Sequence, residues 1–143
     1  MNITYDVDYF ISKFQAIPEE GYCIGELDDT YGAHCANGWC GVTYEALHNA
    51  NFNEETKALQ KIFSILELTK TYDPVCLKAE NTWEEWGYSI KAADINNGET
   101  KEYQQPTPKQ RILAALYDIK AQQQALTECK ALVKISHYQY DIL

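Results

Sequence analysis

The segment TPKQRILAALYDI, residues 107–119, constrains the fold more than any other part of the chain. It starts with a threonine suited to an N-cap, then a proline where the first helical turn needs no amide hydrogen, with a glutamine three residues after the cap. Side chains then follow at alternating spacings of four and three residues, at Ile112, Leu116, Ile119, Gln123 and Leu126. This spacing is typical of a helix packed along its length on another helix or on a second subunit. The sequence therefore predicts a long amphipathic C-terminal helix.

Four further helices are predicted from apolar spacing and capping signals. The first covers residues 4–16, and the second begins near Trp39. The third runs from an Asn53 cap to about residue 69, and the fourth starts at Asn81. The side chains expected to face the core are Val7, Phe10, Ile11, Phe14, Val42, Leu47, Leu59, Ile62, Phe63 and Leu66.

The remaining segments complete the expected fold. Residues 94–108 have the Asn, Gly and Pro content of a loop. The tail 131–143, ALVKISHYQYDIL, is β-branched and aromatic with partial alternation, which favours a terminal strand. We therefore expect one domain, residues 1–143, with a mainly α fold of the α+β class. It has about five helices and a small antiparallel sheet formed by the tail and residues in the 20s.

Charge and composition exclude several classes of protein. The chain carries 12 basic and 21 acidic residues, a formal net charge of -9, which argues against binding nucleic acid through its phosphates. No apolar run reaches the roughly 20 residues that span a bilayer, and the N-terminal residues lack the pattern of an export signal. We expect a cytoplasmic protein, in the host cytoplasm if phage-encoded, with no cofactor and no membrane partner. Because the cytoplasm is reducing, we expect the cysteines to be free thiols. We expect Cys76 and Cys129 to be buried as small hydrophobic side chains.

Residues 21–41, GYCIGELDDTYGAHCANGWCG, hold three cysteines and a histidine in a glycine-broken segment. The side-chain types that zinc prefers are present at Cys23, His34, Cys35 and Cys40. Their intervals are not those of zinc fingers or ribbons. The glycines let a turn-rich segment pass close to other backbone while small side chains fill the space beneath it. We favour this packing role and leave zinc binding as the alternative.

Cys40 is also a candidate nucleophile. We expect it at the N-terminus of the second helix, where the helix dipole and free amides lower the pKa of a thiol. Residues 39–47, WCGVTYEAL, resemble the cysteine and helix start of papain-like and cell-wall endopeptidases. The resemblance implies a hydrolase, with His137 as a distant base.

Four motifs in order, GYCIGEL, WCGVTYEAL, INNG and TPKQRILAALYDI, resemble a family of short, uncharacterised bacterial and phage proteins over roughly residues 20–120. In members of this family, the first motif contains a glycine, a tryptophan or tyrosine, and a cysteine. A tryptophan-cysteine pair then starts a helix, and a loop with asparagine and aspartate precedes an amphipathic helix. Asn97 stands where that family more often has aspartate. The resemblance by itself implies no activity.

In size and layout the chain resembles phage anti-Thoeris proteins, which are sponges that bind a cyclic ADP-ribose immune signal without cleaving it, at sites shared between subunits. This resemblance implies a ligand-contacting arginine near Arg111 and polar residues near Asp94 and Asn96. It fits a physical pattern, because the helix start at Thr107 presents free amides beside Lys109 and the only arginine. Trp83 would supply a ring for base stacking.

The predicted ligand-binding residues are Arg111, Lys109, Thr107, Asp94, Asn96, Asn97 and Trp83. Each set of residues has an alternative role. Lys109 and Arg111 could lie on a solvated helix face, and the tryptophans could pack in the core. Asn-Asn-Gly could form a turn. We expect a non-enzymatic small binding protein, a homo-oligomeric phage anti-defence sponge that sequesters a small nucleotide-derived signal. The alternatives are a cysteine hydrolase centred on Cys40, and an acidic inhibitor that binds a host defence protein or mimics nucleic acid.

Overall fold

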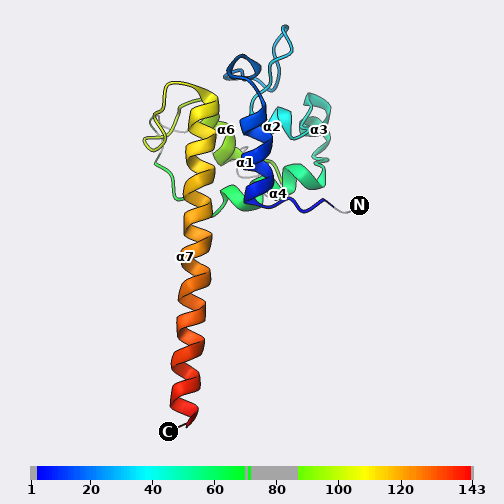
Figure 1. Ribbon diagram of the computed structural model, residues 1–143. Helices are drawn as coiled ribbons and strands as arrows, with labels where there is room; N and C mark the ends of the chain where they lie inside the picture. Colours follow the sequence, from blue (N-terminus) through cyan, green and yellow to red (C-terminus); the bar gives the residue numbers. More distant parts are fainter. Residues whose placement is uncertain (1–2, 70, 72–86, 143) are drawn as a thin grey trace.

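The computed structural model describes residues 3–69, 71 and 87–142. Its helices, in chain order, are α1 (Val7–Ala16), η1 (Glu19–Gly21, a 3-10 turn), α2 (Ala36–Trp39), α3 (Tyr44–Asn49), α4 (Glu54–Phe63), α6 (Ile90–Asn96) and α7 (Pro108–Ile142). The shorter helices gather around one end of α7, and the other end of α7 extends far beyond them (Figure 1). The predicted mainly helical fold is confirmed.

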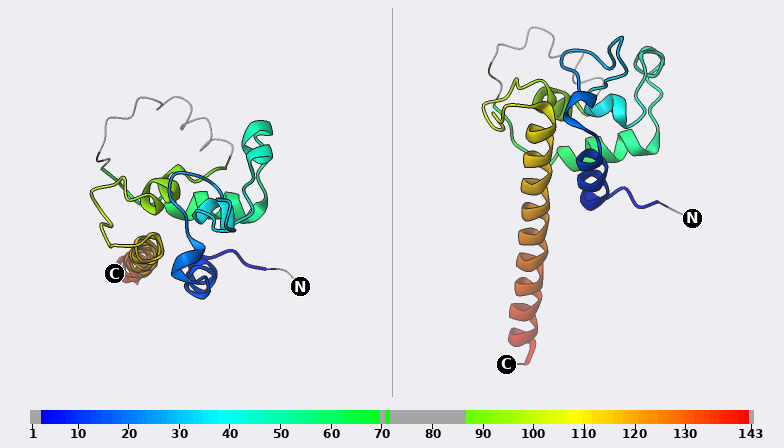
Figure 2. Two further views of the ribbon diagram at one scale, coloured as in Figure 1. Left: turned by 90° about the horizontal axis from the view of Figure 1, so that it is seen from above. Right: turned by 45° about the horizontal axis from the view of Figure 1, so that its top comes forward.

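Helix α1 forms where its apolar spacing predicts. The Asp6 side chain accepts a hydrogen bond from the Tyr9 amide at 2.8 Å and so caps the first turn. Its buried face includes Phe10 and Phe14, neither of which is exposed to solvent. This face packs against α7, and the two helices lie side by side when the molecule is viewed from above (Figure 2).

The second predicted helix is two short helices, α2 and α3. Gly41 separates them with a φ of +96°, a left-handed conformation that a helix does not continue through. The Thr43 hydroxyl then caps α3 by accepting from the Ala46 amide. The predicted Asn53 cap of α4 is confirmed, since its side chain accepts from the Thr56 amide at 2.8 Å. Helix α4 ends at Phe63, before the expected residue 69.

The expected fourth helix start, near Asn81, lies outside the described residues. Helix α6 instead begins after Ser89, whose side chain accepts from the Ala92 amide. The predicted loop therefore starts later than residue 94, because Asp94 to Asn96 form the last turn of α6. Gly98, with a φ of +73°, follows this turn in the left-handed conformation common after helix ends.

Helix α7 begins as predicted, with the Thr107 hydroxyl accepting from the Gln110 amide at 3.2 Å. The first three residues of the alternating series, Ile112, Leu116 and Ile119, are fully buried. They belong to the main hydrophobic cluster, which side chains of α1, α4 and α6 complete. A smaller cluster beside it contains Leu27, Cys35, Val42, Phe52, Tyr88 and Ile90.

The expected terminal strand and small sheet are wrong. Helix α7 continues to Ile142, and in the described part of the chain only isolated bridges join Tyr22 and Asp28 to His34. The physical reason lies in residues 120–131, KAQQQALTECKA, which are mostly strong helix formers. A helix that has already started extends through such a run at little cost. Among the described residues, even α7 lacks the long apolar stretch that crossing a bilayer requires.

Candidate functional site

Arg111 lies inside the protein, only 6% exposed. Its guanidinium donates from Nε to the Ile95 carbonyl at 3.0 Å and from Nη2 to the Asn96 carbonyl at 2.7 Å. A third bond runs from Nη1 to the Gln105 carbonyl at 2.9 Å. The cation therefore satisfies carbonyls at the C-terminus of α6, the end of a helix that favours positive charge.

Asn96 and Asn97, both predicted to bind a ligand, join the end of α6 to residues 23–36. The Asn96 side chain accepts from the Ala36 amide at 3.1 Å and donates to the Cys23 carbonyl at 2.9 Å. The Asn97 side chain accepts from the Gly25 amide at 2.9 Å. Asn96 is fully buried, so its amide group is part of the packing between α2, α6 and the preceding loop.

The other predicted ligand residues are spread over the same end of α7. Thr107 caps the helix, and the Lys109 ammonium donates to the Gln15 carbonyl at 2.9 Å, near the end of α1. Asp94 is 5% exposed on α6. Trp83 lies outside the described residues. The structure thus brings Arg111 and Asn96 together through backbone contacts, and the prediction that they bind a nucleotide stays a prediction.

Cys40 is at the C-cap of α2, and not at the N-terminus of a helix as expected. Its side chain is completely buried, and burial is the main cause that raises the pKa of its thiol far above the usual range. The cysteine that occupies the N-cap position of α2 is Cys35. Its position was missed because the sequence offered no Ser, Thr, Asp or Asn to mark the start of this four-residue helix.

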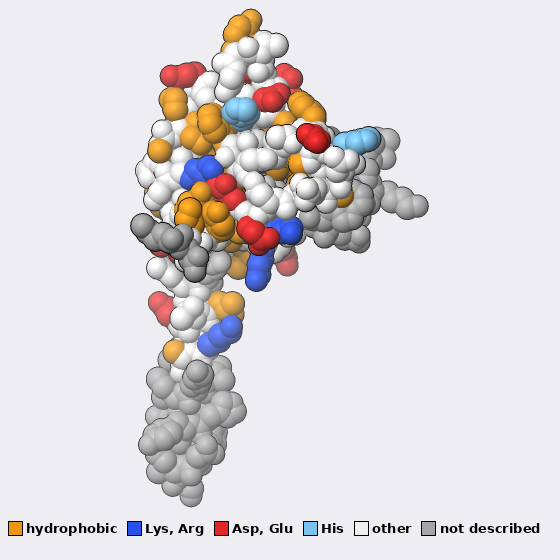
Figure 3. Space-filling view, turned by 90° about the vertical axis from the view of Figure 1, so that its right-hand side faces the viewer, with side chains coloured by type: hydrophobic (Ala, Val, Ile, Leu, Met, Phe, Trp, Pro, Cys, Tyr) orange, Lys and Arg blue, Asp and Glu red, His pale blue; other side chains and the backbone are white. Residues whose placement is uncertain are grey.

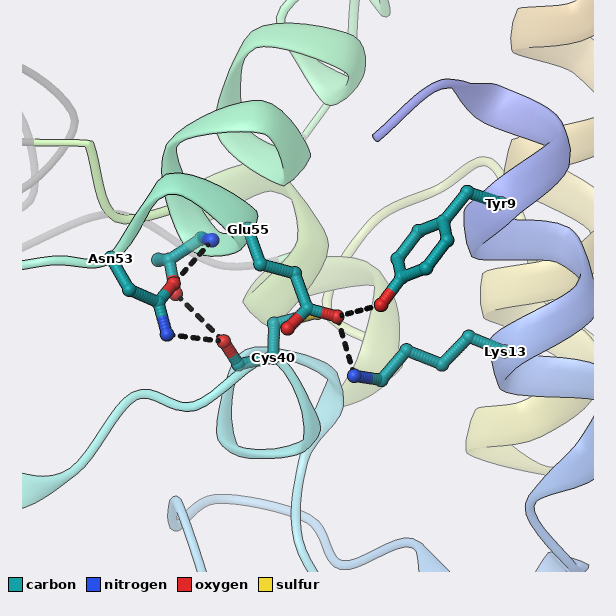
Figure 4. Close-up of polar contacts among 6 residues, drawn as sticks. Tyr9, Lys13, Cys40, Asn53 and Glu55 are labelled. Atoms are coloured by element: carbon teal, nitrogen blue, oxygen red, sulfur yellow. Dashed lines mark hydrogen bonds and ion pairs between the residues drawn. The ribbon is translucent and has the colours of Figure 1, made fainter. Parts of the chain in front are cut away.

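A polar cluster that was not predicted joins α1 to α4 above Cys40 (Figure 4). The Glu55 carboxylate accepts from the Tyr9 hydroxyl at 2.7 Å and from the Lys13 ammonium at 2.5 Å. Beside it, Asn53 and Thr56 both donate from their side chains to the Cys40 carbonyl at 3.1 Å. These bonds lock α2 against α4, so the cluster serves to position helices.

Two of the hollows on the described surface lie beside the loop 24–34 and α7. One, of about 180 Å³, is lined by Leu27, Cys35, Tyr44, Leu47 and Tyr88, among others. The second, of about 520 Å³, lies where α7 leaves the body, and its lining includes Asp6, Asp8, Lys120, Gln123, Thr127 and Glu128. Lys120 pairs there with Asp8 at 2.8 Å. No group of three or more potential metal ligands occurs within the described residues.

Past this groove, whose lining on α7 reaches Glu128, the helix extends away from the other helices (Figure 1). Every side chain from Ala121 to Ala131 is exposed, including Leu126 at 51%. Cys129 is exposed as well, so the expectation that it is buried is wrong. At about 1.5 Å per residue, the part of α7 after Lys120 is roughly 30 Å long. We call residues 121–142 the distal half of α7.

Comparison of the chain with protein-family models, with curated proteins and with solved structures found no match.

Proposed function

We propose that this chain is a non-enzymatic binding protein that works as a homo-oligomer, and that the distal half of α7 is the element through which its copies associate. The observation that carries the proposal is the exposure of every described side chain from Ala121 to Ala131 on a helix that has left its own core. In proteins most helical stability comes from packing one face of the helix against other elements. A second copy supplies the missing contacts.

The sequence of the distal half supports a partner of this kind. Its first residues, with three glutamines and several alanines, have high helix propensity, whereas the following segment contains β-branched and aromatic residues that favour helices less. Apolar residues also continue to the end of the chain, at Leu132, Val133, Ile135 and Ile142 in the sequence. Packing against another helix offsets the weaker propensity of this segment.

The site geometry favours binding over catalysis. A cysteine hydrolase needs an accessible thiolate, and the buried Cys40 thiol has a raised pKa. An acidic inhibitor would gather its carboxylates on one face. On the face drawn in Figure 3, acidic side chains lie in small groups among lysines, hydrophobic and uncharged side chains.

The ligand class in this proposal comes from the resemblance to sponge proteins, which implies a nucleotide-derived signal bound between subunits. The side chains of Arg111 and Asn96 already form hydrogen bonds within the chain. A ligand shared by two copies would therefore be held by other groups, with these internal bonds left intact. The test is calorimetry with cyclic ADP-ribose isomers and cyclic dinucleotides on the full chain. Heat that saturates at a fixed ratio per oligomer is expected, and no heat from any of these compounds would remove the sponge function.

Association is tested by measuring molar mass with light scattering. The wild type should give a multiple of the 16.4 kDa chain mass. A variant with Leu126→Glu and Cys129→Glu, two exposed positions one turn apart on α7, should shift to the chain mass because buried charge opposes association. The matched control carries Ile24→Glu and Tyr31→Glu, which add the same charges at exposed positions away from α7. A wild type that stays at 16.4 kDa, or equal dissociation of both variants, would refute association through α7.

A further inference from the structure

Two buried cysteines, Cys23 and Cys35, each follow one member of a bridged residue pair at the base of the loop 24–34. Tyr22 and His34 form a parallel bridge, in which the His34 amide donates to the Gly21 carbonyl at 3.0 Å and the Cys23 amide donates to the His34 carbonyl at 3.1 Å. Cys23 and Cys35 are the next residues on the two paired segments. Paired segments run about 4.8 Å apart, with residues in register pointing to the same side.

This register is compatible with a disulfide, which joins residues whose Cα atoms are about 4.4 to 6.8 Å apart. Both cysteines are free and buried, with Cys23 9% exposed and Cys35 5% exposed. Burial is the main cause that raises the pKa of Cys23 to about 11, and the charge on Cys35 is the next cause.

The surroundings of Cys35 act on its thiol in two opposite directions. Burial raises the pKa of its thiol, while hydrogen bonds from the backbone amides of Gly38 and Asn37 lower it. These amides stabilise the thiolate when it forms. Cys35 also lines the hollow of about 180 Å³, which gives its side chain room to change position.

We propose that Cys23 and Cys35 form a redox-active dithiol that small-molecule disulfides convert to an intramolecular disulfide. The thiolate of Cys23, the more exposed of the two, attacks one sulfur of the reagent and releases one reagent thiol. The thiolate of Cys35 then attacks the Cys23 sulfur of this mixed disulfide and releases the second reagent thiol. The protein loses two electrons and two protons, and the reagent gains both as its two thiols.

The bond would close the loop 24–34 at its base. Asp29 already orders the tip, because its side chain accepts from the amides of Tyr31 and Ala33. Tyr31 is 93% exposed at this tip. Oxidation would therefore fix the base of an ordered, exposed loop, and this property is independent of association through α7.

The experiment oxidises the folded full chain with glutathione disulfide, in a Cys129→Ser background that removes the exposed thiol. The protein is then unfolded, alkylated with N-ethylmaleimide, digested and analysed by mass spectrometry. The expected product is a peptide pair linked through Cys23 and Cys35, with Cys40 alkylated. Cys40 is the internal control, since it is buried even more completely. Dithiothreitol should return both thiols to the alkylated form.

A second variant separates pairing from general reactivity. With Cys35→Ser, the reaction should stop at a glutathione adduct on Cys23, because the second thiol is absent. Full alkylation of both Cys23 and Cys35 after oxidation would overturn the proposal. So would a disulfide that links either of them to Cys40 or Cys76 as the main product.

Discussion

Arg111 has a structural role in the interior of the protein, although its position in the sequence is typical of a ligand-binding residue. The only arginine follows a helix start, where its charge and the free amides together are typical of an anion site. In the structure the side chain turns to the C-terminal carbonyls of α6. The neighbouring Gly98 is suited to its φ of +73°, and a Cβ there would make an ordinary contact with the guanidinium carbon at 3.4 Å.

Replacing Arg111 should therefore destabilise the fold. Arg111→Met removes three hydrogen bonds to backbone carbonyls in a buried site, and we expect the free energy of unfolding to fall by about 3 kcal/mol. Arg111→Lys keeps the charge without the fork of donors, and should cost about half as much. Urea unfolding followed by circular dichroism measures both losses. Equal midpoints for wild type and Arg111→Met would contradict the structural role.

The buried thiols predict a loss of stability at alkaline pH. The pKa of Cys23 is about 11 in the folded chain, against 9.0 for an ordinary cysteine. Since the unfolded state releases its proton first as pH rises, stability is retained below about pH 9 and lost between about pH 9 and 11, by roughly 2 to 3 kcal/mol for the Cys23 thiol. Chemical unfolding across this range measures the loss, which Cys23→Ser should reduce. A flat profile in the wild type would be inconsistent with burial of the thiol.

Residue roles were harder to predict than residue burial. Burial of Phe10, Phe14 and Leu59 follows from spacing alone, because a helix has one core-facing stripe. The roles of Cys40 and Asn96 depend on which segments meet, such as the contact between Asn96 and Cys23, which are far apart in the sequence. Spacing along the chain carries no information about such long-range contacts.

At the scale of elements, the bonds from Tyr9 and Lys13 to Glu55 join α1 to α4. The Glu55 and Lys13 side chains are 16% and 23% exposed, so the pair is partly shielded from water. Glu55→Gln removes the charge but keeps the shape, and should lower the free energy of unfolding by about 1 to 2 kcal/mol. The interaction itself is measured by a double-mutant cycle with Lys13→Met. Purely additive losses in that cycle would show that the pair contributes nothing.

Helices with a capping residue and a clear apolar stripe were predictable, as α1, α4 and the start of α7 show. Boundaries set by tertiary contacts were not. Helix α6 extends through Asn96 because Arg111 and the buried Ile95 hold its last turn, although Asn-Asn-Gly is typical of a turn. The C-terminal tail was misassigned because β-branched and aromatic composition favours strands only where a partner strand exists.

At the scale of the whole molecule, the central feature is a helix whose first half packs in the core and whose side chains from Ala121 to Ala131 are exposed. The buried face of α7 ends near Ile119, and the exposed positions Gln123 and Leu126 continue the same alternating spacing. The spacing predicted packing on another helix or on a second subunit. The first half packs within its own chain, and our proposal assigns the second half to another copy.

The most direct test of this assignment is amide hydrogen exchange along α7 at high and low protein concentration. Association predicts that amides of residues 121–142 are protected in the concentrated sample and lose protection on dilution, while those of residues 112–119 stay protected throughout. Rapid exchange of residues 121–142 at every concentration would mean that no second copy covers the distal half of α7.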